Sequence, residues 1–427
     1  MEKTTAKSGD YVEIHLTHLI YEGILLESAE NEKDVVLLKL DSGYNIGFHK
    51  KDISKIVLMK KARDRESEKV EIKKDSEKPT IALVITGGTI ASILNPKTGG
   101  VHALQKPEDF FKFYPELFKK ANVVVENPFM KMSEDMDPKD WQKIARVVVD
   151  LLNDSNIKGV IITHGTDTLH YTSSALSFFI RDLNKPVVLT YSQRSIDRAS
   201  SDADLNLQCA AVVAISDMAE VSLVGHASSN DDFCYAMPGT KVRKLHTSRR
   251  DAFKVVNAKP FAKIFPDKIE RISEWKIKNK NKAKLDAKFE EKVALVKIYP
   301  GQNPDILDYY SKNKYKGIVL ELTGLGQAPT RKSRNSWTQK LKEIQKKGIV
   351  VCAVSQCIFG RVDPLVYSNG REILETGVIY LEDMLAETAY VKLGWVLGHE
   401  DWAKNKKIVK EKMLENFSNE INYRLEE

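Results

Sequence analysis

Short apolar runs alternate with longer amphipathic stretches along most of the chain after residue 80. The runs with the length and apolar composition of a buried strand are 81–86, 123–127, 159–163, 186–190 and 210–215. Between them, 137–154 and 168–183 repeat apolar residues at the three- and four-residue intervals of an amphipathic helix. Strands that alternate with helices in this way predict an open parallel sheet with helices on its faces.

The same alternation resumes after residue 292 and predicts a second α/β domain. Its strand candidates are 293–299, 317–322 and 348–354, and a helix is expected around 335–347. From residue 384 onward the pattern is helical. The chain after residue 80 is therefore expected to form a body of two parallel-sheet α/β domains.

The residues before this body have a different pattern, which predicts a small all-β domain. Residues 11–28 alternate apolar and polar side chains in places, and two further runs flank a turn-forming Asp-Ser-Gly sequence. The charged segment that follows has few large apolar residues, a composition typical of a linker. The predicted division is 1–60 for the all-β domain, 61–79 for the linker, 80–275 for the first α/β domain, 276–291 for a lysine-rich connector and 292–427 for the second α/β domain with terminal helices.

The length and the charge are those of an ordinary globular protein. A chain of 427 residues is long enough for two or three domains, each with its own core. The net charge of +7 is small for this length, and the lysine-rich segments 276–292 and 402–415 also carry acidic residues. Such a mixture is typical of solvated helix faces and linkers rather than of a groove for nucleic acid.

Nothing in the composition indicates secretion or insertion into a membrane. The N-terminal segment is polar and of mixed charge, unlike a secretory signal or a transit peptide. No apolar run approaches the roughly 20 residues that span a bilayer. The cysteines are too scattered for a disulfide framework or for paired zinc ligands; they are Cys209, Cys234, Cys352 and Cys357. We expect a cytoplasmic protein that does not contact membranes.

Two glycine-containing stretches with hydroxyl side chains lie at the ends of predicted strands. They are Thr-Gly-Gly-Thr at 86–89 and His-Gly-Thr-Asp-Thr at 164–168. Neither has the glycine spacing of a phosphate-binding loop. A helix cap is the simple alternative for each, with Thr89 in the first stretch and Asp167 or Thr168 in the second. Because the carboxyl ends of parallel strands meet at one edge of a sheet, we favour a single site built from both.

A threonine hydroxyl becomes a nucleophile only when a neighbouring group takes its proton. Lys244, in the basic stretch 242–253, is a candidate for this role, although an isolated lysine is more often a surface residue. Cys234 lacks the glycine elbow of a nucleophile, and His164 is more typical of a turn or of the core. No carboxylate–histidine cluster has the spacing of a metal site. The residues therefore indicate metal-free acyl transfer.

These stretches resemble the signature blocks of the bacterial-type asparaginase/glutaminase family. Thr-Gly-Gly-Thr-Ile-Ala matches the first block, His-Gly-Thr-Asp-Thr matches the second, and Lys244 matches the lysine that follows some eighty residues later. The resemblance continues through 133–136, 367–379 and 386–398, and so covers almost everything after residue 80. With its leading all-β unit and charged linker, the chain resembles the archaeal family of glutamyl-tRNA(Gln) amidotransferase D subunits, because free-standing asparaginases usually lack that unit.

The resemblance implies a role for each matched position. Thr89 would be the acyl-accepting nucleophile, while Thr166, Asp167 and Lys244 would handle the proton. Asp167 would also pair with the α-ammonium group of the substrate. The other implied substrate-binding positions are Ser133, which matches the contact to the α-carboxylate, Glu134, which stands where bacterial relatives often have glutamine, and Gly88.

The segment that commonly carries a lid tyrosine in these enzymes has none here. It spans 92–104, and its Lys-Thr-Gly-Gly sequence is still compatible with a lid. Without the tyrosine, Lys244 would have to act as the base, and neutralising a free lysine near pH 7 costs about 4–5 kcal/mol. We therefore favour a relay through threonine, aspartate and lysine over a permanently neutral lysine.

The family implies a glutaminase subunit that passes ammonia to a partner. That partner, the amidotransferase E subunit, would hold ATP, magnesium and Glu-tRNA(Gln), whereas this chain would need no cofactor and no metal. A homodimer of this chain and a heterotetramer of two D and two E subunits are implied as well. The alternatives are a stand-alone L-asparaginase/glutaminase and a non-catalytic scaffold with the same fold.

Overall fold

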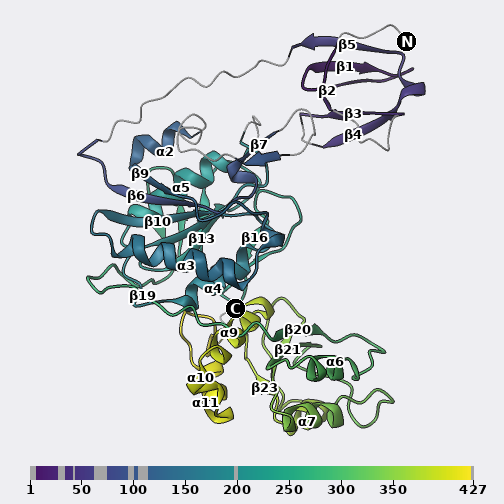
Figure 1. Ribbon diagram of the computed structural model, residues 1–427, viewed down its shortest axis with the longest axis vertical. Helices are drawn as coiled ribbons and strands as arrows, with labels where there is room; N and C mark the ends of the chain where they lie inside the picture. The colour runs from purple at the N-terminus through teal and green to yellow at the C-terminus, as the bar shows by residue number, and fades with distance from the viewer. Residues whose placement is uncertain are drawn as a thin grey trace.

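The computed structural model describes residues 6–26, 34–41, 44–61, 75–94, 101–103, 114–196 and 201–424. Figure 1 shows three units that follow one another along the chain. A small β domain lies at one end of the molecule, an α/β domain occupies the middle, and a second α/β domain lies at the other end. The predicted fold class, an α/β body preceded by a small all-β domain, is confirmed.

The N-terminal domain is a five-stranded antiparallel sheet in the order β4-β3-β2-β1-β5. Its strands are β1 (Tyr11–His15), β2 (Ile20–Leu26), β3 (Val35–Lys39), β4 (Asn45–His49) and β5 (Lys55–Lys60). Alternate residues of β1 point inward, and Val12 and Ile14 are fully buried. The domain thus has a core of its own, to which Val36, Leu38, Phe48 and Ile53 also belong.

The first α/β domain is built on an eight-stranded mixed sheet in the order β18-β17-β14-β13-β12-β10-β6-β9. Its five parallel strands are β6 (Thr80–Ile85), β9 (Asn122–Glu126), β10 (Ile157–Thr163), β12 (Val187–Thr190) and β13 (Val221–His226). The antiparallel strands β14 (Cys234–Pro238), β17 (Ala262–Ile264) and β18 (Ile269–Arg271) extend one edge. The strands β6, β10, β12 and β13 are almost entirely buried because both faces of the sheet are covered there, whereas the edge strand β9 is partly exposed.

Helices cover the two faces of this sheet and create two cores. The helices are α2 (Pro115–Lys120), α3 (Pro138–Asn153), α4 (Leu169–Phe179) and α5 (Ala203–Ile215). Ala82 and Val84 of β6 face the layer of α3 and α4, whereas Ile81, Leu83 and Ile85 face the layer of α2 and α5. A Pro at N1 and a capping box between Asp137 and Asp140 fix where α3 begins.

One predicted strand is wrong. The run 210–215 is the second half of the helix α5, and the strand that we assigned to it is β13, which begins at Val221. The helix packs against β10, β12 and β13 on one side and against α2 on another, so almost all of its faces are buried. A short run without a polar face does not distinguish a helix from a strand. The predicted helix 168–183 is shorter than expected, since α4 ends at Phe179.

The second α/β domain has a four-stranded parallel sheet in the order β20-β21-β22-β23. The strands are β20 (Val293–Lys297), β21 (Gly317–Leu322), β22 (Val350–Ser355) and β23 (Ile379–Tyr380). The helices are α6 (Ile306–Lys312), α7 (Thr338–Lys346), α8 (Ser368–Leu374), α9 (Ala386–Leu397), α10 (Glu400–Ala403) and α11 (Lys406–Leu414). The strand and helix predictions after residue 292 are confirmed in type.

Helix α9 joins the two α/β domains. One side of it packs against β20, β21 and β22, and the other side packs against α4 of the first domain. Phe178 of α4 stacks on Trp395 of α9 with the ring centroids 5.5 Å apart. Buried residues from both domains therefore belong to one continuous apolar core around α9. Figure 1 shows α9 at the junction, beside α4.

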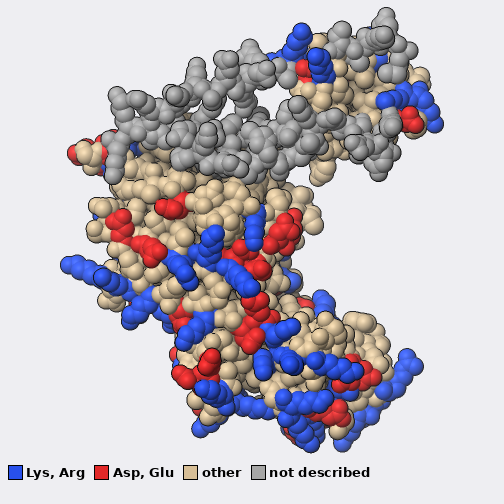
Figure 2. All heavy atoms as spheres, viewed as in Figure 1, with Lys and Arg blue, Asp and Glu red and all other residues tan. Residues whose placement is uncertain are grey.

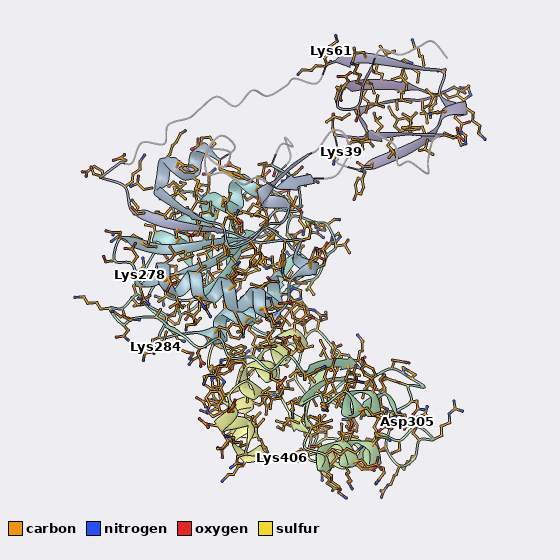
Figure 3. The ribbon with its side chains drawn as sticks, viewed as in Figure 1. Lys39, Lys61, Lys278, Lys284, Asp305 and Lys406 are labelled. Atoms are coloured by element: carbon orange, nitrogen blue, oxygen red, sulfur yellow. The ribbon has the colours of Figure 1, made fainter. Side chains whose placement is uncertain are left out.

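The predicted linker and connector differ in what the structure shows of them. Most of 61–79 lies outside the described residues, but its last part is anchored, because Asn122 Nδ2 donates to the carbonyls of Asp75 and Lys78 at 2.6 and 3.1 Å. The connector 276–291 packs on the first α/β domain through β19 (Lys284–Leu285), which pairs with β11 (Ile180–Arg181). Figure 3 shows two of its lysines, Lys278 and Lys284, beside that domain.

Charged residues of both signs are interspersed over the α/β domains. On the face drawn in Figure 2, Lys and Arg side chains lie among Asp and Glu side chains. This mixture agrees with solvated surfaces on that face rather than with a continuous basic groove. In the described part of the chain, no helix is both long enough and apolar enough to cross a membrane.

Candidate active site

The two glycine-containing stretches meet at the carboxyl ends of β6 and β10. These strands are parallel neighbours, and the Thr86 hydroxyl donates to the Thr163 carbonyl at 2.8 Å. The backbone then turns through Gly87 and Gly88, whose φ angles of +119° and +81° favour glycine. A Cβ atom at Gly88 would lie 2.4 Å from the backbone nitrogen of Gly165. The two loops therefore touch backbone to backbone, which places Thr89 next to the second stretch.

Thr89 does not cap an α-helix. It begins a single 3₁₀ turn, Thr89–Ala91, and the described chain then continues as the strand β7 (Ser92–Leu94), which pairs with β8 (Val101–Ala103). A hydrogen bond from the core stabilises this turn, because the hydroxyl of the buried Tyr114 donates to the Ile90 carbonyl at 2.9 Å. Thr89 is only partly buried. The helix-cap alternative is therefore wrong for this residue, and its side chain has access to the surface.

Lys244 contacts both Thr166 and Asp167 of the second stretch. Its Nζ donates to Thr166 Oγ1 at 2.8 Å and to Asp167 Oδ1 at 2.7 Å. Lys244 comes from β15 (Val242–Lys244), far along the chain from its partners. The lysine side chain is 11% exposed, whereas the Asp167 side chain is 62% exposed. The ammonium group is thus held inside the site while the carboxylate faces the surface.

Ser133 supports the second stretch from a third segment of the chain. Its hydroxyl oxygen accepts a hydrogen bond from the Asp167 backbone N–H at 3.2 Å, and its carbonyl accepts one from the Thr168 hydroxyl at 2.6 Å. Thr168 occupies the N-cap position of α4, but its side chain makes no capping hydrogen bond. The cap alternative is therefore wrong for Thr168 as well. Glu134, the neighbouring candidate, is exposed.

His164 belongs to the core, as expected. It is fully buried, and burial lowers its pKa to about 4, so the imidazole is neutral near pH 7. Its Nδ1 lies 2.7 Å from the Gly165 carbonyl, which only accepts, so Nδ1 carries the hydrogen. Its Nε2, 2.8 Å from the Thr172 hydroxyl, is then the acceptor. The ring fixes the start of the His-Gly-Thr-Asp-Thr loop rather than acting as a base.

Cys234 is buried in the core, and burial raises the pKa of its thiol. It is therefore no nucleophile. The segment 95–100, which holds most of the expected lid sequence, and the segment 104–113 lie outside the described residues.

Two supporting ion pairs, Lys131 with Asp140 and Arg243 with Glu387, were not identified from the sequence. The backbone N–H of Lys131 donates to the Thr86 carbonyl at 3.0 Å, and its Nζ binds both oxygens of Asp140 at 2.8 Å, which fixes the segment that leads to Ser133. Arg243 Nη2 lies 2.9 Å from Oε1 of Glu387 in the second α/β domain. Contacts between distant segments have no local sequence signal, so pattern reading alone does not find them.

Cavity size does not locate this site. A cavity of about 660 Å³ lies between the two α/β domains, and Lys259, Phe359 and Asn422 are among the residues that line it. None of the candidate site residues is among the described residues that line it. The candidate site lies where Thr166, Asp167 and Lys244 converge through hydrogen bonds, on the loop that contacts Gly88 next to Thr89.

Comparison with known protein families divides the chain into three matched parts. The family model for the GatD N-terminal domain matches residues 6–59, the N-terminal asparaginase model matches 80–277, and the glutaminase/asparaginase C-terminal domain model matches 292–410. Among solved structures, the thermostable L-asparaginase from Thermococcus kodakarensis has a TM-score of 0.71 and 30% sequence identity. The match covers 81% of this chain and all of that protein.

Several relatives that match nearly the whole chain carry the same name. The glutamyl-tRNA(Gln) amidotransferase D subunit of Thermococcus kodakarensis is 46% identical over 410 residues, which covers 94% of this chain and 91% of the relative. The D subunit of Methanothermobacter thermautotrophicus is 42% identical over 428 residues, with 99% and 96% covered. The chain therefore belongs to the family of glutamyl-tRNA(Gln) amidotransferase D subunits.

Proposed function

We propose that this chain is the glutamine-hydrolysing subunit of a tRNA-dependent amidotransferase. It releases ammonia from glutamine, and a partner protein uses that ammonia to convert Glu-tRNA(Gln) to Gln-tRNA(Gln). The contact of Lys244 Nζ with both Thr166 and Asp167, beside Thr89, is the observation that carries the proposal. Family membership with relatives of this name supports the choice of reaction.

Thr89 is the proposed nucleophile. Its Oγ1 attacks the amide carbon of glutamine, and a relay through Thr166, Asp167 and Lys244 carries its proton to the leaving nitrogen, which departs as ammonia. The product of this step is a glutamyl ester of Thr89. Water then attacks the ester carbon, its proton returns to Thr89 through the same relay, and glutamate leaves. The atoms balance as glutamine plus water to glutamate plus ammonia.

Lys244 stays paired with Asp167 in the proposed relay. Its Nζ lies 2.7 Å from Asp167 Oδ1 and 2.8 Å from Thr166 Oγ1, so one group contacts both other members of the relay. This geometry supports a relay through threonine, aspartate and lysine. In the proposed relay, Thr166 is the first group to accept the proton of Thr89. Thr166 follows Gly165, and Gly165 contacts Gly88, the residue before Thr89.

Substrate recognition is proposed to use the exposed side of the same residues. Lys244 contacts Asp167 Oδ1, so Oδ2 is available to the α-ammonium group of glutamine. Ser133, on the segment that contacts the Asp167 loop, and the backbone at Gly88 are proposed to hold the α-carboxylate. Glu134, which is exposed and next to Ser133, is a further candidate contact.

The wider assembly is proposed from the family. The partner is the amidotransferase E subunit, which holds ATP, Mg²⁺ and the Glu-tRNA, and this chain brings no cofactor of its own. Two copies of this chain form a homodimer, and the complete enzyme contains two D and two E subunits. The complex acts in the cytoplasm.

The test uses the assembled complex and two nitrogen sources. Thr89→Val removes one hydroxyl at nearly constant volume, so we expect folding to persist and glutamine-dependent amidation to fall at least about 10³-fold. Added ammonium chloride should restore amidation of Glu-tRNA by the same variant, and Thr89→Ser should retain part of the glutamine-dependent rate. Full glutamine-dependent activity of Thr89→Val would contradict the role of Thr89.

A stand-alone L-asparaginase is the second candidate function. The likeness to the Thermococcus kodakarensis L-asparaginase, which covers the whole of that protein, supports it. It predicts steady asparagine hydrolysis by the purified chain, at a rate that a candidate partner does not change. Amidation of Glu-tRNA that requires both this chain and its partner would favour the first proposal instead.

A further inference from the structure

The strand that carries Lys244 is attached to the second α/β domain. Successive side chains of a strand point to opposite sides, so Arg243 and Lys244 of β15 lie on opposite sides. Lys244 reaches the loop of Thr166 and Asp167. Arg243 contacts Glu387 in the first turn of α9, and Lys241, which directly precedes the strand, contacts Asp383 just before that helix.

Two ion pairs make this attachment. Lys241 Nζ lies 2.6 Å from Asp383 Oδ2, and both side chains are buried. Arg243 Nη2 lies 2.9 Å from Glu387 Oε1, and Glu387 is also buried. A hydrogen bond adds to them, because the Thr388 hydroxyl donates to the Thr240 carbonyl at 2.8 Å. Thr240 and Arg243 therefore have polar contacts with the first turn of α9, and Lys241 has one with Asp383 just before that turn.

The same end of α9 contacts the helix that follows Asp167. In α4, the Ser174 hydroxyl lies 3.0 Å from the Thr388 hydroxyl, and His170 Nε2 lies 3.9 Å from Glu387 Oε1. Burial lowers the pKa of His170 to about 3, so this contact is between a neutral ring and a carboxylate. Lys244 lies in β15, and Asp167 lies just before α4. Both of these elements therefore contact the N-terminal end of α9.

We propose that Glu387 and Asp383, through Arg243 and Lys241, are positioning residues that fix Lys244 against Thr166 and Asp167. This inference rests on the proposed function, because it concerns the same Lys244. It assigns to the second α/β domain a part in a site whose reacting residues all come from the first. The attachment orients Lys244, whose amino group is carried on a flexible four-carbon stem. A shift of such a group by about 1 Å is enough to slow a reaction up to about 100-fold.

Glu387 is costly to bury, which supports a role beyond packing. Burial raises its pKa, and the nearby Arg243 guanidinium opposes that rise. Among the described residues, neither Glu387 Oε2 nor His170 Nδ1 has a hydrogen-bond partner. A contact selected for stability alone would satisfy such atoms or replace them with apolar groups.

The test compares two buried carboxylates, Glu387 in α9 and Glu420, which pairs with a lysine of α9. Glu387→Gln keeps the size of the side chain but removes the charge that holds Arg243, and we expect kcat for ammonia release to fall about 10-fold or more. The matched control is Glu420→Gln. Glu420 pairs with Lys392 of α9 at 2.6 Å, also fully buried but away from β15. The control should lower the thermal midpoint and leave kcat of the folded complex unchanged.

A second background distinguishes positioning from a general loss of structure. In the Lys244→Met variant, adding Glu387→Gln should lower the residual rate by less than twofold, because the group that Glu387 positions is gone. If Glu387→Gln lowers that residual rate by the same factor as in the wild type, the proposal is overturned. A wild-type kcat for Glu387→Gln overturns it as well. If that variant does not fold, Arg243→Gln tests the same pair from its partly exposed side.

The outcomes also separate this inference from the proposed function. If Lys244→Met hydrolyses glutamine at the wild-type rate, the proposed site is wrong and the inference falls with it. If Lys244→Met abolishes hydrolysis while Glu387→Gln and Arg243→Gln keep full kcat, the site stands and only the positioning role fails.

Discussion

A single added methyl group at Gly88 tests whether contact between the two loops is required. In Gly88→Ala the new Cβ would lie 2.4 Å from the Gly165 nitrogen and 2.5 Å from its Cα, although ordinary van der Waals contact begins at 3.4 Å. The loops must therefore part by about 1 Å. A residue with a side chain at φ +81° costs about 1–2 kcal/mol, and the overlap adds about 1–3 kcal/mol.

The expected loss of unfolding free energy is therefore about 2–5 kcal/mol, a large share of the usual 5–15 kcal/mol of a protein. A displacement of Thr89 by about 1 Å is expected to slow glutamine hydrolysis about 100-fold. Urea titration measures the first quantity, and steady-state ammonia release under conditions in which the variant is folded measures the second.

Gly301→Ala is the matched control. Gly301 has nearly the same backbone angle, φ +86°, but a Cβ there would meet nothing within 4 Å. This substitution should cost only the backbone strain of about 1–2 kcal/mol and leave the rate unchanged. Equal losses of stability in the two variants, or wild-type hydrolysis by Gly88→Ala, would refute the reasoning that the loops must touch for the site to work.

Two further predictions concern stability. The pKa of His164 is about 4 in the folded protein and about 6.5 in the unfolded chain, so the unfolded chain takes up the proton first, and stability falls as pH drops from about 6.5 towards 4. Between pH 7.5 and 5.0 this residue accounts for a loss of about 2 kcal/mol in the free energy of unfolding. Urea titrations at the two pH values should show that His164→Gln removes this loss. An unchanged pH dependence in the variant would contradict the prediction. Glu420→Ala removes the carboxylate that pairs with the buried Lys392 and leaves the hydrogen bonds of Lys392 Nζ to the carbonyls of Met413 and Glu415, and urea unfolding should show a loss of about 3 kcal/mol. A loss below about 1 kcal/mol would show that these carbonyls suffice.

Elements with one dominant environment were predictable from the sequence. The strand β21, Gly317–Leu322, coincides with the predicted run, because a parallel strand covered on both faces is largely apolar, here with the exception of Glu321. The helix α3 begins and ends within one residue of the predicted 137–154, since an amphipathic face and a capping box mark it. Failure came where a helix was buried on nearly all sides, as for α5, because no polar face remained to reveal the period.

The site was predictable only in part. Placement at strand ends pointed to the loops of Thr89 and Asp167, since parallel strands bring their carboxyl ends together. Lys244 required the family resemblance, because a lysine in a basic stretch is by itself more typical of a surface. Nothing in the local sequence indicated a role for Glu387 in the site. It lies in an apolar helical run, and only the tertiary fold brings it to Arg243.

The distribution of apolar cores indicates which parts of this chain can be exchanged. The N-terminal sheet buries Val12, Leu38 and Phe48 among its own strands, so it is a module that can be gained, lost or grafted without opening the rest. The two α/β domains lack that independence. Severing the chain within 276–291 would bare α4 on one fragment and α9 on the other, so this pair is expected to be inherited, and engineered, as one piece.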